Sequence, residues 1–313
     1  MEDLSLPPAV CIMGATGTGK TELGIQLLDE FPFEIINVDS AQVFKEMNIG
    51  TAKPDAETLK RAPHRILDFI DPADAYSAAD FRNDALREMR EITAAGKIPL
   101  LVGGTMLYFR ALINGIADLP PANPRFREKL QVEADTKGWG VLHERLQEID
   151  PESAARIHPN DPQRLQRALE VYELTGTPLT THHKTSKHET IPYRLLKFAL
   201  IPRDREKLRE RLACRFEKML DEGLVEEVQK LYNRPDLSIN LPSIRCVGYR
   251  QVWEHLNGEI DYNTMKERAI VATRQLAKRQ MTWLRSEQRI ATLHMEDENL
   301  VAVTSRIRGF LIQ

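Results

Sequence analysis

Four runs of apolar residues, each bounded by polar or glycine-rich segments, dominate the hydrophobic pattern of the chain. They are AVCIM (9–13), FEIINV (33–38), KIPLLV (97–102) and LLKFALI (195–201). Unbroken apolar runs of this length are typical of strands that are buried on both faces of a parallel sheet. The pattern therefore predicts a parallel sheet in which these four runs are strands.

Segments with helical periodicity lie between the runs. ELGIQLLDE (22–30) follows the first run, and SAADFRNDALREMREITAAG (77–96) precedes the third, with a serine at its start and a glycine at its end. Alternation of strands and helices predicts an α/β fold. Ligands bind at the carboxyl ends of the strands in such sheets, so we expect the functional residues in the loops that follow the four runs.

The strand pattern stops between about residues 117 and 194, where a proline-rich linker, DLPPANP (118–124), precedes amphipathic helical patterns. After residue 203 the pattern is almost entirely helical. We therefore expect an α/β core with a parallel sheet flanked by helices, formed by residues 1–116 and 195–313, and a helical insertion domain at 117–194.

Composition and charge narrow the class of protein. Hydrophobic residues make up 42% and charged residues 28% of the 313 residues, as in ordinary soluble proteins. No apolar run reaches the ~18 residues that a membrane helix needs. The N-terminal MEDLSLPPA lacks the features of a signal peptide, and the three distant cysteines form no C-x-x-C pair. We expect a cytoplasmic protein with reduced thiols and no membrane partner.

The net charge is −3, but the charges are unevenly distributed. Residues 1–60 hold four Lys/Arg against ten Asp/Glu, whereas residues 241–289 hold nine against five. A basic C-terminal part indicates a polyanion bound on one side of the molecule. Chance clustering would give the same counts, so charge alone leaves both interpretations open.

The first apolar run leads into GATGTGKT (14–21), which fits the pattern G-x-x-x-x-G-K-[ST]. The glycines let the backbone curl so that its N–H groups point at phosphate oxygens, and the following helix contributes its positive N-terminal end. Lys20 would add a point charge, and the Thr21 hydroxyl would hold Mg²⁺. The motif predicts a P-loop-type core that binds a diphosphate or a triphosphate with Mg²⁺.

The identity of the phosphate compound stays open at this point. A kinase or NTPase is expected to carry an aspartate after a later strand, but KIPLLV ends in GGT (103–105). The only aspartate at a strand end is Asp39, which Ser-Ala-Gln follows. A P-loop small-molecule kinase that uses ATP is the first alternative. A non-catalytic RNA-binding protein with a vestigial loop is the second, and the intact Lys20-Thr21 pair argues against it.

Eight segments in order along the chain closely resemble bacterial tRNA dimethylallyltransferases. They are GATGTGKT, NVDSAQVFKEMNIGTAKP (37–54), PHRILD (63–68), YSAADFR (76–82), LVGGTMLYFRAL (101–112), HPNDPQRLQRALEV (158–171), LPSIRCVGYRQVW (241–253) and ATRQLAKRQMTWLR (272–285). Each except the glycine loop is weak alone, but eight in order are very specific. The resemblance runs from about residue 9 to residue 285.

The resemblance implies an enzyme that moves a dimethylallyl group from dimethylallyl diphosphate to an adenine of tRNA. The acceptor would be N6 of the adenine 3′-adjacent to the anticodon, in tRNAs that read codons beginning with U. The glycine loop would then hold an isoprenoid diphosphate instead of ATP. The partners would be dimethylallyl diphosphate and the tRNA anticodon stem-loop, and we expect the enzyme to be a monomer.

The resemblance also implies roles for individual residues. Asp39 would be the general base that takes the N6 proton, with Thr105 beside it, although the residues alone favour a capping aspartate. Arg215 matches the arginine that reaches the diphosphate, and a solvated helix face is its alternative. The complete expected diphosphate site is Gly14, Ala15, Thr16, Gly17, Thr18, Gly19, Lys20, Thr21 and Arg215.

Basic and polar side chains in several of the matching segments are expected to contact tRNA. Gln163, Arg164 and Arg167 share one side of a predicted helix, and cations recur along one face of a later helix at 274–285. A solvated surface is the alternative for each group taken alone. The full expected set is Asp39, Ser40, Ala41, Gln42, Thr105, Arg127, Gln163, Arg164, Leu165, Gln166, Arg167, Arg245, Cys246, Val247, Gly248, Tyr249, Arg250, Arg274, Lys278 and Arg285.

Overall fold

The computed structural model describes residues 4–185, 190–297 and 299–312, and the chain forms two compact units. The first unit spans Met1–Ile113 and Ile191–Gln313, and the second spans Asn114–Thr190. Throughout the described ranges, no helix combines the length and the apolar character needed to cross a bilayer.

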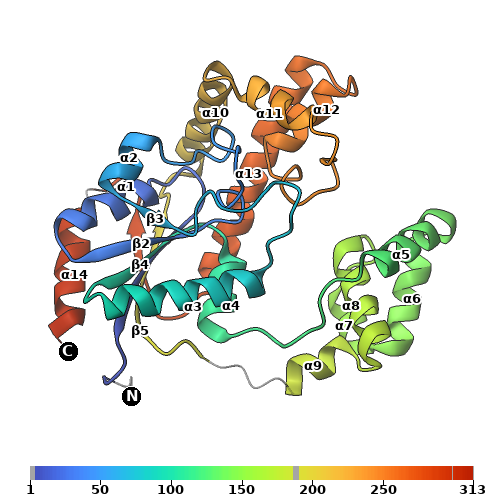
Figure 1. Cartoon of the computed structure of the whole chain (residues 1–313), viewed down its shortest axis with the longest axis horizontal. Coiled ribbons are helices and arrows are strands. Elements are labelled where there is room, and N and C mark those ends of the chain that lie inside the picture. Colours follow the sequence, from blue (N-terminus) through green and yellow to red (C-terminus); the bar gives the residue numbers. More distant parts are fainter. Residues whose placement is uncertain (1–3, 186–189, 298, 313) are drawn as a thin grey trace. The chain divides into compact units, whose positions relative to one another are not determined.

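A six-stranded parallel sheet forms the middle of the first unit (Figure 1). Its strands are β1 (Pro8–Gly14), β2 (Phe33–Val38), β3 (His64–Arg65), β4 (Ile98–Gly103), β5 (Arg194–Ile201) and β6 (Ile290–His294), in the order β3-β2-β4-β1-β5-β6. The four apolar runs are β1, β2, β4 and β5, and every paired strand is parallel. The predicted α/β fold with a parallel sheet flanked by helices is confirmed.

The two edge strands, β3 and β6, were not predicted. β6 lies after residue 203, where we expected an almost entirely helical pattern, and it interrupts the helices there. An edge strand pairs on one side only and is less covered than a central one. β6 accordingly buries a single residue, Leu293, so it lacks the long apolar run that marks a central strand.

Helices cover both faces of the sheet. Alternate residues of a strand point to opposite faces. On β1, Cys11 and Met13 belong to a cluster with α3 (Ala78–Ala94) and α13 (Tyr262–Ser286), whereas Ile12 belongs to a cluster with α1 (Lys20–Gln26) and α14 (Leu300–Ile312). The sequence signal at the start of α3 is confirmed, because Ser77 and Asp80 form a reciprocal capping box there.

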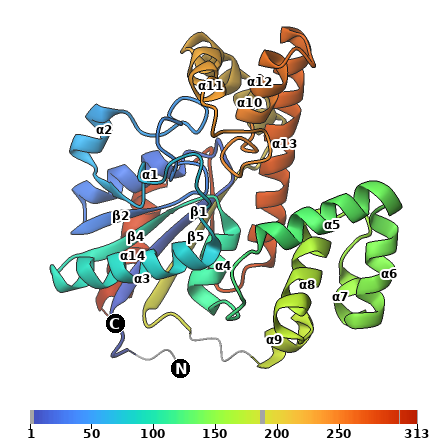
Figure 2. The ribbon, with the colours of Figure 1, turned by 45° about the vertical axis from the view of Figure 1, so that its right-hand side comes forward.

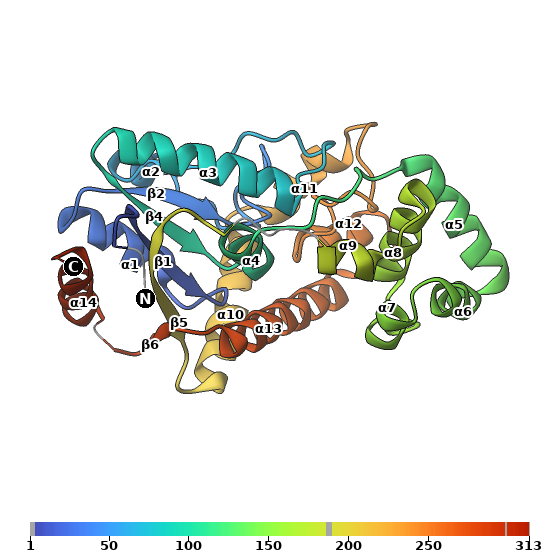
Figure 3. The ribbon, with the colours of Figure 1, turned by 90° about the horizontal axis from the view of Figure 1, so that it is seen from below.

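The C-terminal helices α10 (Arg205–Asp221), α11 (Leu224–Tyr232) and α12 (Tyr249–Leu256) pack with α13 into one group (Figure 2). The long helix α13 runs beside α10 and also contacts β1 (Figure 3). The remaining helical elements of this unit are η1 (Leu27–Asp29), α2 (Ala56–Arg61) and α4 (Met106–Asn114).

The second unit contains α5 (Pro124–Lys137), α6 (Trp139–Ile149), α7 (Pro151–Arg156), α8 (Pro162–Thr175) and α9 (Leu179–Thr185). Asn or Asp caps followed by proline start α5, α7 and α8. The helices enclose a core that includes Leu142, Leu146 and Leu165. The fully buried Glu170 accepts hydrogen bonds from Arg127 and Arg167 inside this unit.

Candidate active site

The glycine loop connects β1 to α1 at the carboxyl end of the sheet. Gly17 and Gly19 have φ angles of 81° and 89°, a region that glycine enters without the strain a side chain would cause. The Thr18 hydroxyl donates to the carbonyl of Ala15 at 2.9 Å, and Lys20 Nζ donates to the same carbonyl at 3.4 Å. These two hydrogen bonds join side chains of the loop to its own backbone and so stabilise its curled conformation.

Asp39 and Thr105 follow two paired strands, β2 and β4, whose register runs to Val38 opposite Gly103. Oδ1 of Asp39 accepts from the N–H groups of Ala41 at 2.9 Å and Gln42 at 3.3 Å. Within the described residues, Oδ2 of this carboxylate accepts no hydrogen bond. The Thr105 hydroxyl accepts from the Ser40 N–H at 3.0 Å, which ties the two strand ends together.

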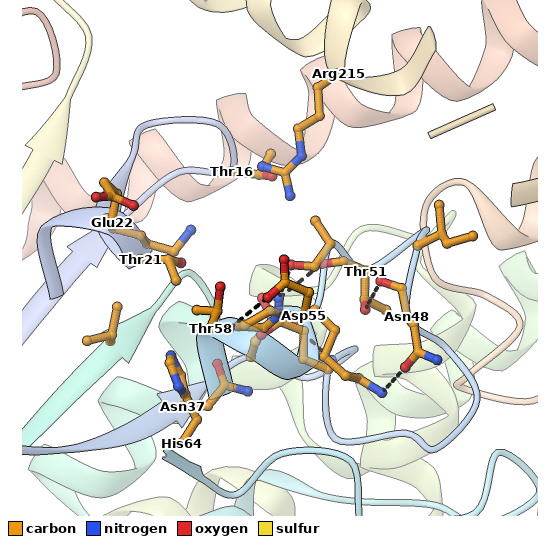
Figure 4. Close-up of a pocket in the computed structure, with 18 of the residues that line it drawn as sticks. Thr16, Thr21, Glu22, Asn37, Asn48, Thr51, Asp55, Thr58, His64 and Arg215 are labelled. Atoms are coloured by element: carbon orange, nitrogen blue, oxygen red, sulfur yellow. Dashed lines mark hydrogen bonds between the residues drawn. The ribbon is translucent and has the colours of Figure 1, made fainter. Parts of the chain in front are cut away.

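Two adjoining cavities meet at these loops. The larger has a volume of about 950 Å³ and the smaller about 350 Å³, and Thr16, Lys20, Asp39 and Arg215 line both. Figure 4 shows the Arg215 side chain reaching from α10 toward the larger cavity, on the same side as Thr16 and Thr21. These four residues, Thr16, Lys20, Asp39 and Arg215, hereafter the junction, bring a carboxylate, a lysine and an arginine to one place.

The charges at the junction perturb one another. The Lys20 side chain is half-buried, and this burial lowers its pKa to about 8. The nearby Asp39 carboxylate raises the pKa of Lys20, and the nearby Arg215 guanidinium lowers it further. Burial likewise lowers the pKa of Arg215, with Asp39 opposing and Arg211 adding. Two neighbouring cations with a single carboxylate between them favour an anionic ligand, because the anion offsets their mutual repulsion.

The segment 245–250, which we expected to contact tRNA, has some residues at the smaller cavity and others in the core. Arg245, Cys246 and Val247 line the smaller cavity together with Ser40, Ala41 and Thr105. Burial raises the pKa of the Cys246 thiol to about 12, so it stays protonated. Tyr249 is fully buried and donates to Glu227, so any effect of Tyr249 on a ligand passes through the residues that it holds.

Other predicted residues hold the backbone or other side chains. The amide of Gln42 donates to Thr51 and Ala52 carbonyls, Gly248 takes a φ of 94° where the chain turns into α12, and Arg250 pairs with Glu254. On α13, Arg274, Lys278 and Arg285 line a further cavity of about 420 Å³ beside α10. These three cations are exposed and make no ion pair with any described residue.

In the second unit, the expected RNA contacts differ in their surroundings. Gln163 and Arg164 are exposed, whereas Leu165 is buried in the core of the unit. The guanidinium groups of Arg127 and Arg167 both donate to Glu170, and the Gln166 amide donates to the Arg127 carbonyl. Gln163 and Arg164 are therefore the members of this set that are most available to a ligand.

One residue of the smaller cavity could not be singled out from the sequence. Gln280 of α13 lines the smaller cavity and bonds to both the glycine loop and the GGT turn. The cations of the segment ATRQLAKRQMTWLR recur along one helix face, whereas an amide in a helix carries no local signal that it contacts backbone elsewhere. The matching segment itself was the one available indication.

The fold and this geometry define an α/β protein whose glycine loop, between β1 and α1, has the sequence pattern of phosphate-binding loops. Comparison of the chain with known proteins narrows the class of protein further. The model of the family described as IPP transferase matches residues 42–287. The chain is 58% identical over 305 residues to a tRNA dimethylallyltransferase from Thioalkalivibrio sulfidiphilus, covering 97% of this chain and 95% of that protein.

Two solved structures resemble the whole chain. The full-length tRNA isopentenylpyrophosphate transferase from Bacillus halodurans has a TM-score of 0.70 and 34% identity, covering 96% of each chain. A eukaryotic dimethylallyltransferase acting on tRNA has a TM-score of 0.79 and 28% identity, covering 97% of this chain and 77% of that one. The chain belongs to the IPP transferase family. It is a transferase, as the sequence predicted.

Proposed function

We propose that this enzyme transfers a dimethylallyl group from dimethylallyl diphosphate to N6 of the adenine 3′-adjacent to the anticodon, in tRNAs that read codons beginning with U. The observation that carries the proposal is the junction, where Asp39 faces the same cavities as Lys20 and Arg215. A proton acceptor and two cations at one place match a reaction that removes a proton and releases a diphosphate. Two relatives whose names include tRNA, a tRNA dimethylallyltransferase and a dimethylallyltransferase acting on tRNA, support tRNA as the substrate.

Asp39 is proposed as the general base. The N6 lone pair of adenine is delocalised into the ring, so the amine must lose a proton as its bond to the allylic carbon forms. Oδ1 of Asp39 is fixed by two backbone amides, which leaves Oδ2 to accept that proton. Thr105 lies beside it and holds Ser40, and so positions the base.

The glycine loop, Lys20 and Arg215 are proposed to hold the diphosphate. Negative charge grows on the bridging oxygen as the carbon–oxygen bond breaks, and positive charge already in place stabilises that change. Lys20 and Arg215 stand in the junction before a ligand arrives. Thr16 and Thr18 contribute by shaping the loop.

Mg²⁺ is proposed as the cofactor. The predicted ligand, the Thr21 hydroxyl, lines the larger cavity, and an oxygen donor of this kind suits the ion. Among the described residues, no group of three or more His, Cys, Asp or Glu could hold a metal by itself. The ion would therefore also depend on phosphate oxygens, where it would neutralise charge on the leaving diphosphate.

Cations of the first unit and an exposed amide of the second unit are proposed to bind the tRNA. The target base must leave its stack before it can react, at a cost of roughly a few kcal/mol. Arg274, Lys278 and Arg285 would contact phosphates, and Gln163 and Arg245 would contact bases. The segments 39–42 and 245–250, with Thr105, would surround the extruded adenine. That the enzyme acts as a monomer in the cytoplasm stays a prediction.

The decisive assay incubates the protein with unmodified tRNA, Mg²⁺ and labelled dimethylallyl diphosphate. Label should appear in tRNA and, after digestion, in a single modified adenosine next to the anticodon. ATP-dependent phosphorylation of a small molecule with no labelled tRNA would instead favour the kinase alternative. Binding of tRNA without transfer would favour a non-catalytic RNA-binding protein.

A further inference from the structure

The side chain of Gln280 spans two loops that belong to different halves of the reaction. Its Oε1 accepts from the Thr16 N–H at 2.9 Å, and its Nε2 donates to the Gly104 carbonyl at 2.8 Å. Thr16 belongs to the glycine loop, and Gly104 precedes Thr105 in the turn beside Asp39. A single amide thus connects the loop after β1 to the turn after β4.

The two bonds require a side chain that carries both a donor and an acceptor, as an amide does. The Thr16 N–H can only donate and the Gly104 carbonyl can only accept, so the side chain between them must offer one acceptor and one donor. A carboxylate supplies only acceptors, and lysine or arginine only donors. The fit is also close, because a Cβ on Gly104 would lie 2.7 Å from Nε2 of Gln280.

The contact extends from Gln280 to the base. Gly104 and Thr105 both donate from their backbone N–H groups to the Val38 carbonyl, one residue before Asp39. Thr105 in turn accepts from the N–H of Ser40, one residue after Asp39. The position of Asp39 relative to the glycine loop therefore depends on a chain of contacts that ends at Gln280.

We propose that Gln280 is a positioning residue that sets the distance between the base and the diphosphate loop. This inference rests on the proposed function and adds a role for a residue that the function does not require as a catalyst. Gln280 acts through Thr16 on the leaving group and through Gly104 and Thr105 on Asp39. Its loss would therefore change the transfer step and diphosphate binding together, while the cations that bind tRNA are left in place.

Two variants test the role. Gln280→Met keeps the length of the side chain and removes both hydrogen bonds, and Gln280→Glu keeps an acceptor but places a carboxylate against the Gly104 carbonyl. Gln275→Met and Gln275→Glu are matched controls, because Gln275 is exposed on the same helix. Each protein is measured for its single-turnover transfer rate per active site, its Kd for inorganic pyrophosphate, its Kd for tRNA and its Tm.

We expect the single-turnover rate of both Gln280 variants to fall about 10- to 100-fold, the factor that two ordinary hydrogen bonds represent. Pyrophosphate should bind several-fold more weakly, tRNA affinity should stay within about twofold, and the Gln275 variants should behave like the parent.

Three results would overturn the proposal. The first is an unchanged transfer rate. The second is a loss confined to tRNA affinity, which would make Gln280 an RNA contact. The third is a lower Tm with a normal rate per active site, which would make it a packing residue. A parent protein that transfers nothing to tRNA would instead refute the proposed function, and the pyrophosphate measurement would still test Gln280.

Discussion

At the scale of single residues, the two carboxylate oxygens of Asp39 differ in their surroundings. Oδ1 is bound by the amides of Ala41 and Gln42, so the side chain is held in one orientation. A capping aspartate and a catalytic base were alternatives on sequence grounds. The two interpretations are compatible, because the capping contacts hold Oδ1 and leave Oδ2 for the role that we propose.

Asp39→Asn separates the two roles. The asparagine amide can keep the capping contacts through its own oxygen but cannot take a proton. The single-turnover rate should fall by about 10²–10⁴, the usual range for a general base. Affinity for tRNA should change far less, and Asp39→Ala should add a loss of turn stability. Near-normal turnover of Asp39→Asn would assign the base to another residue.

Lys20 should impose a pH limit on the use of dimethylallyl diphosphate. Burial lowers its pKa to about 8, and only the protonated form carries the charge that we propose binds the diphosphate. As the pH rises through about 8, kcat/KM for the diphosphate should therefore fall, since this ratio reports the free enzyme. The measurement is a pH profile between 6.5 and 9.5. A profile with the same alkaline limb in Lys20→Met would show that another group titrates.

At the scale of elements, α10 and α13 place their cations in different surroundings. Arg215 of α10 lines both cavities, and its partial burial lowers its pKa. Arg274, Lys278 and Arg285 of α13 are exposed and free of ion pairs with the described residues. We therefore expect substitutions on the two helices to give different kinetic signatures.

Arg215→Ala should lower both kcat and the affinity for dimethylallyl diphosphate. The charge of Arg215 should stabilise the transition state more than the bound substrate, because negative charge grows on the diphosphate as it leaves. The loss should therefore be larger in kcat/KM than in substrate binding alone. Arg209→Ala is the matched control, because Arg209 is exposed on the same helix and pairs with Glu206. If the two variants behaved alike, Arg215 would be part of a solvated face.

Lys278→Ala should flatten the salt dependence of tRNA binding. Each phosphate contact in single-stranded RNA contributes a slope of about −0.7 in log affinity against log salt, so one contact should be lost. The measurement is tRNA affinity across a salt series. Arg268→Ala is the control on the same helix, because Arg268 pairs with Glu254. An unchanged slope in Lys278→Ala would remove α13 from the phosphate contacts.

In the second unit, Gln163 gives the cleaner test of base recognition. Replacing Arg167 would leave the buried Glu170 with one arginine fewer, so a loss of stability would accompany any loss of RNA contact. Gln163→Ala should weaken cognate tRNA more than non-cognate tRNA, because its exposed amide can pair with a base edge.

At the scale of the whole molecule, the loop at 47–53 is fixed by one buried carboxylate. Glu227 of α11 accepts from the N–H groups of Asn48 at 2.9 Å, Ile49 at 2.8 Å and Gly50 at 3.2 Å, and from the Tyr249 hydroxyl. Asn48, Ile49 and Thr51 line the larger cavity, so a contact in the core shapes the wall of the site.

Glu227→Gln should lower the free energy of unfolding by about 1–3 kcal/mol, because an uncharged amide cannot satisfy four donors equally well. The KM for dimethylallyl diphosphate should rise as well, since the loop lines the cavity. Urea unfolding and steady-state kinetics measure the two effects. Glu226→Gln, at the exposed neighbouring position, should change neither.

The sequence predicted those parts of the molecule whose signals are local. Long apolar runs marked β1, β2, β4 and β5, and the glycine loop has a spacing of its own. The contacts of Gln280 and Glu227 join side chains to backbone amides 264 and about 180 residues away, and no local pattern records them. The edge strands were missed for the different reason that little of their surface is buried.

These distant partners have a consequence for synthesis of the protein. A ribosome makes the glycine loop among the first residues and Gln280 and Glu227 more than 170 residues later. Until then the Thr16 N–H and the amides of Asn48, Ile49 and Gly50 lack the partners that hold them in the finished fold. We therefore expect a nascent chain that ends before α13 to contain the glycine loop without the Gln280 contact that holds it in the finished fold.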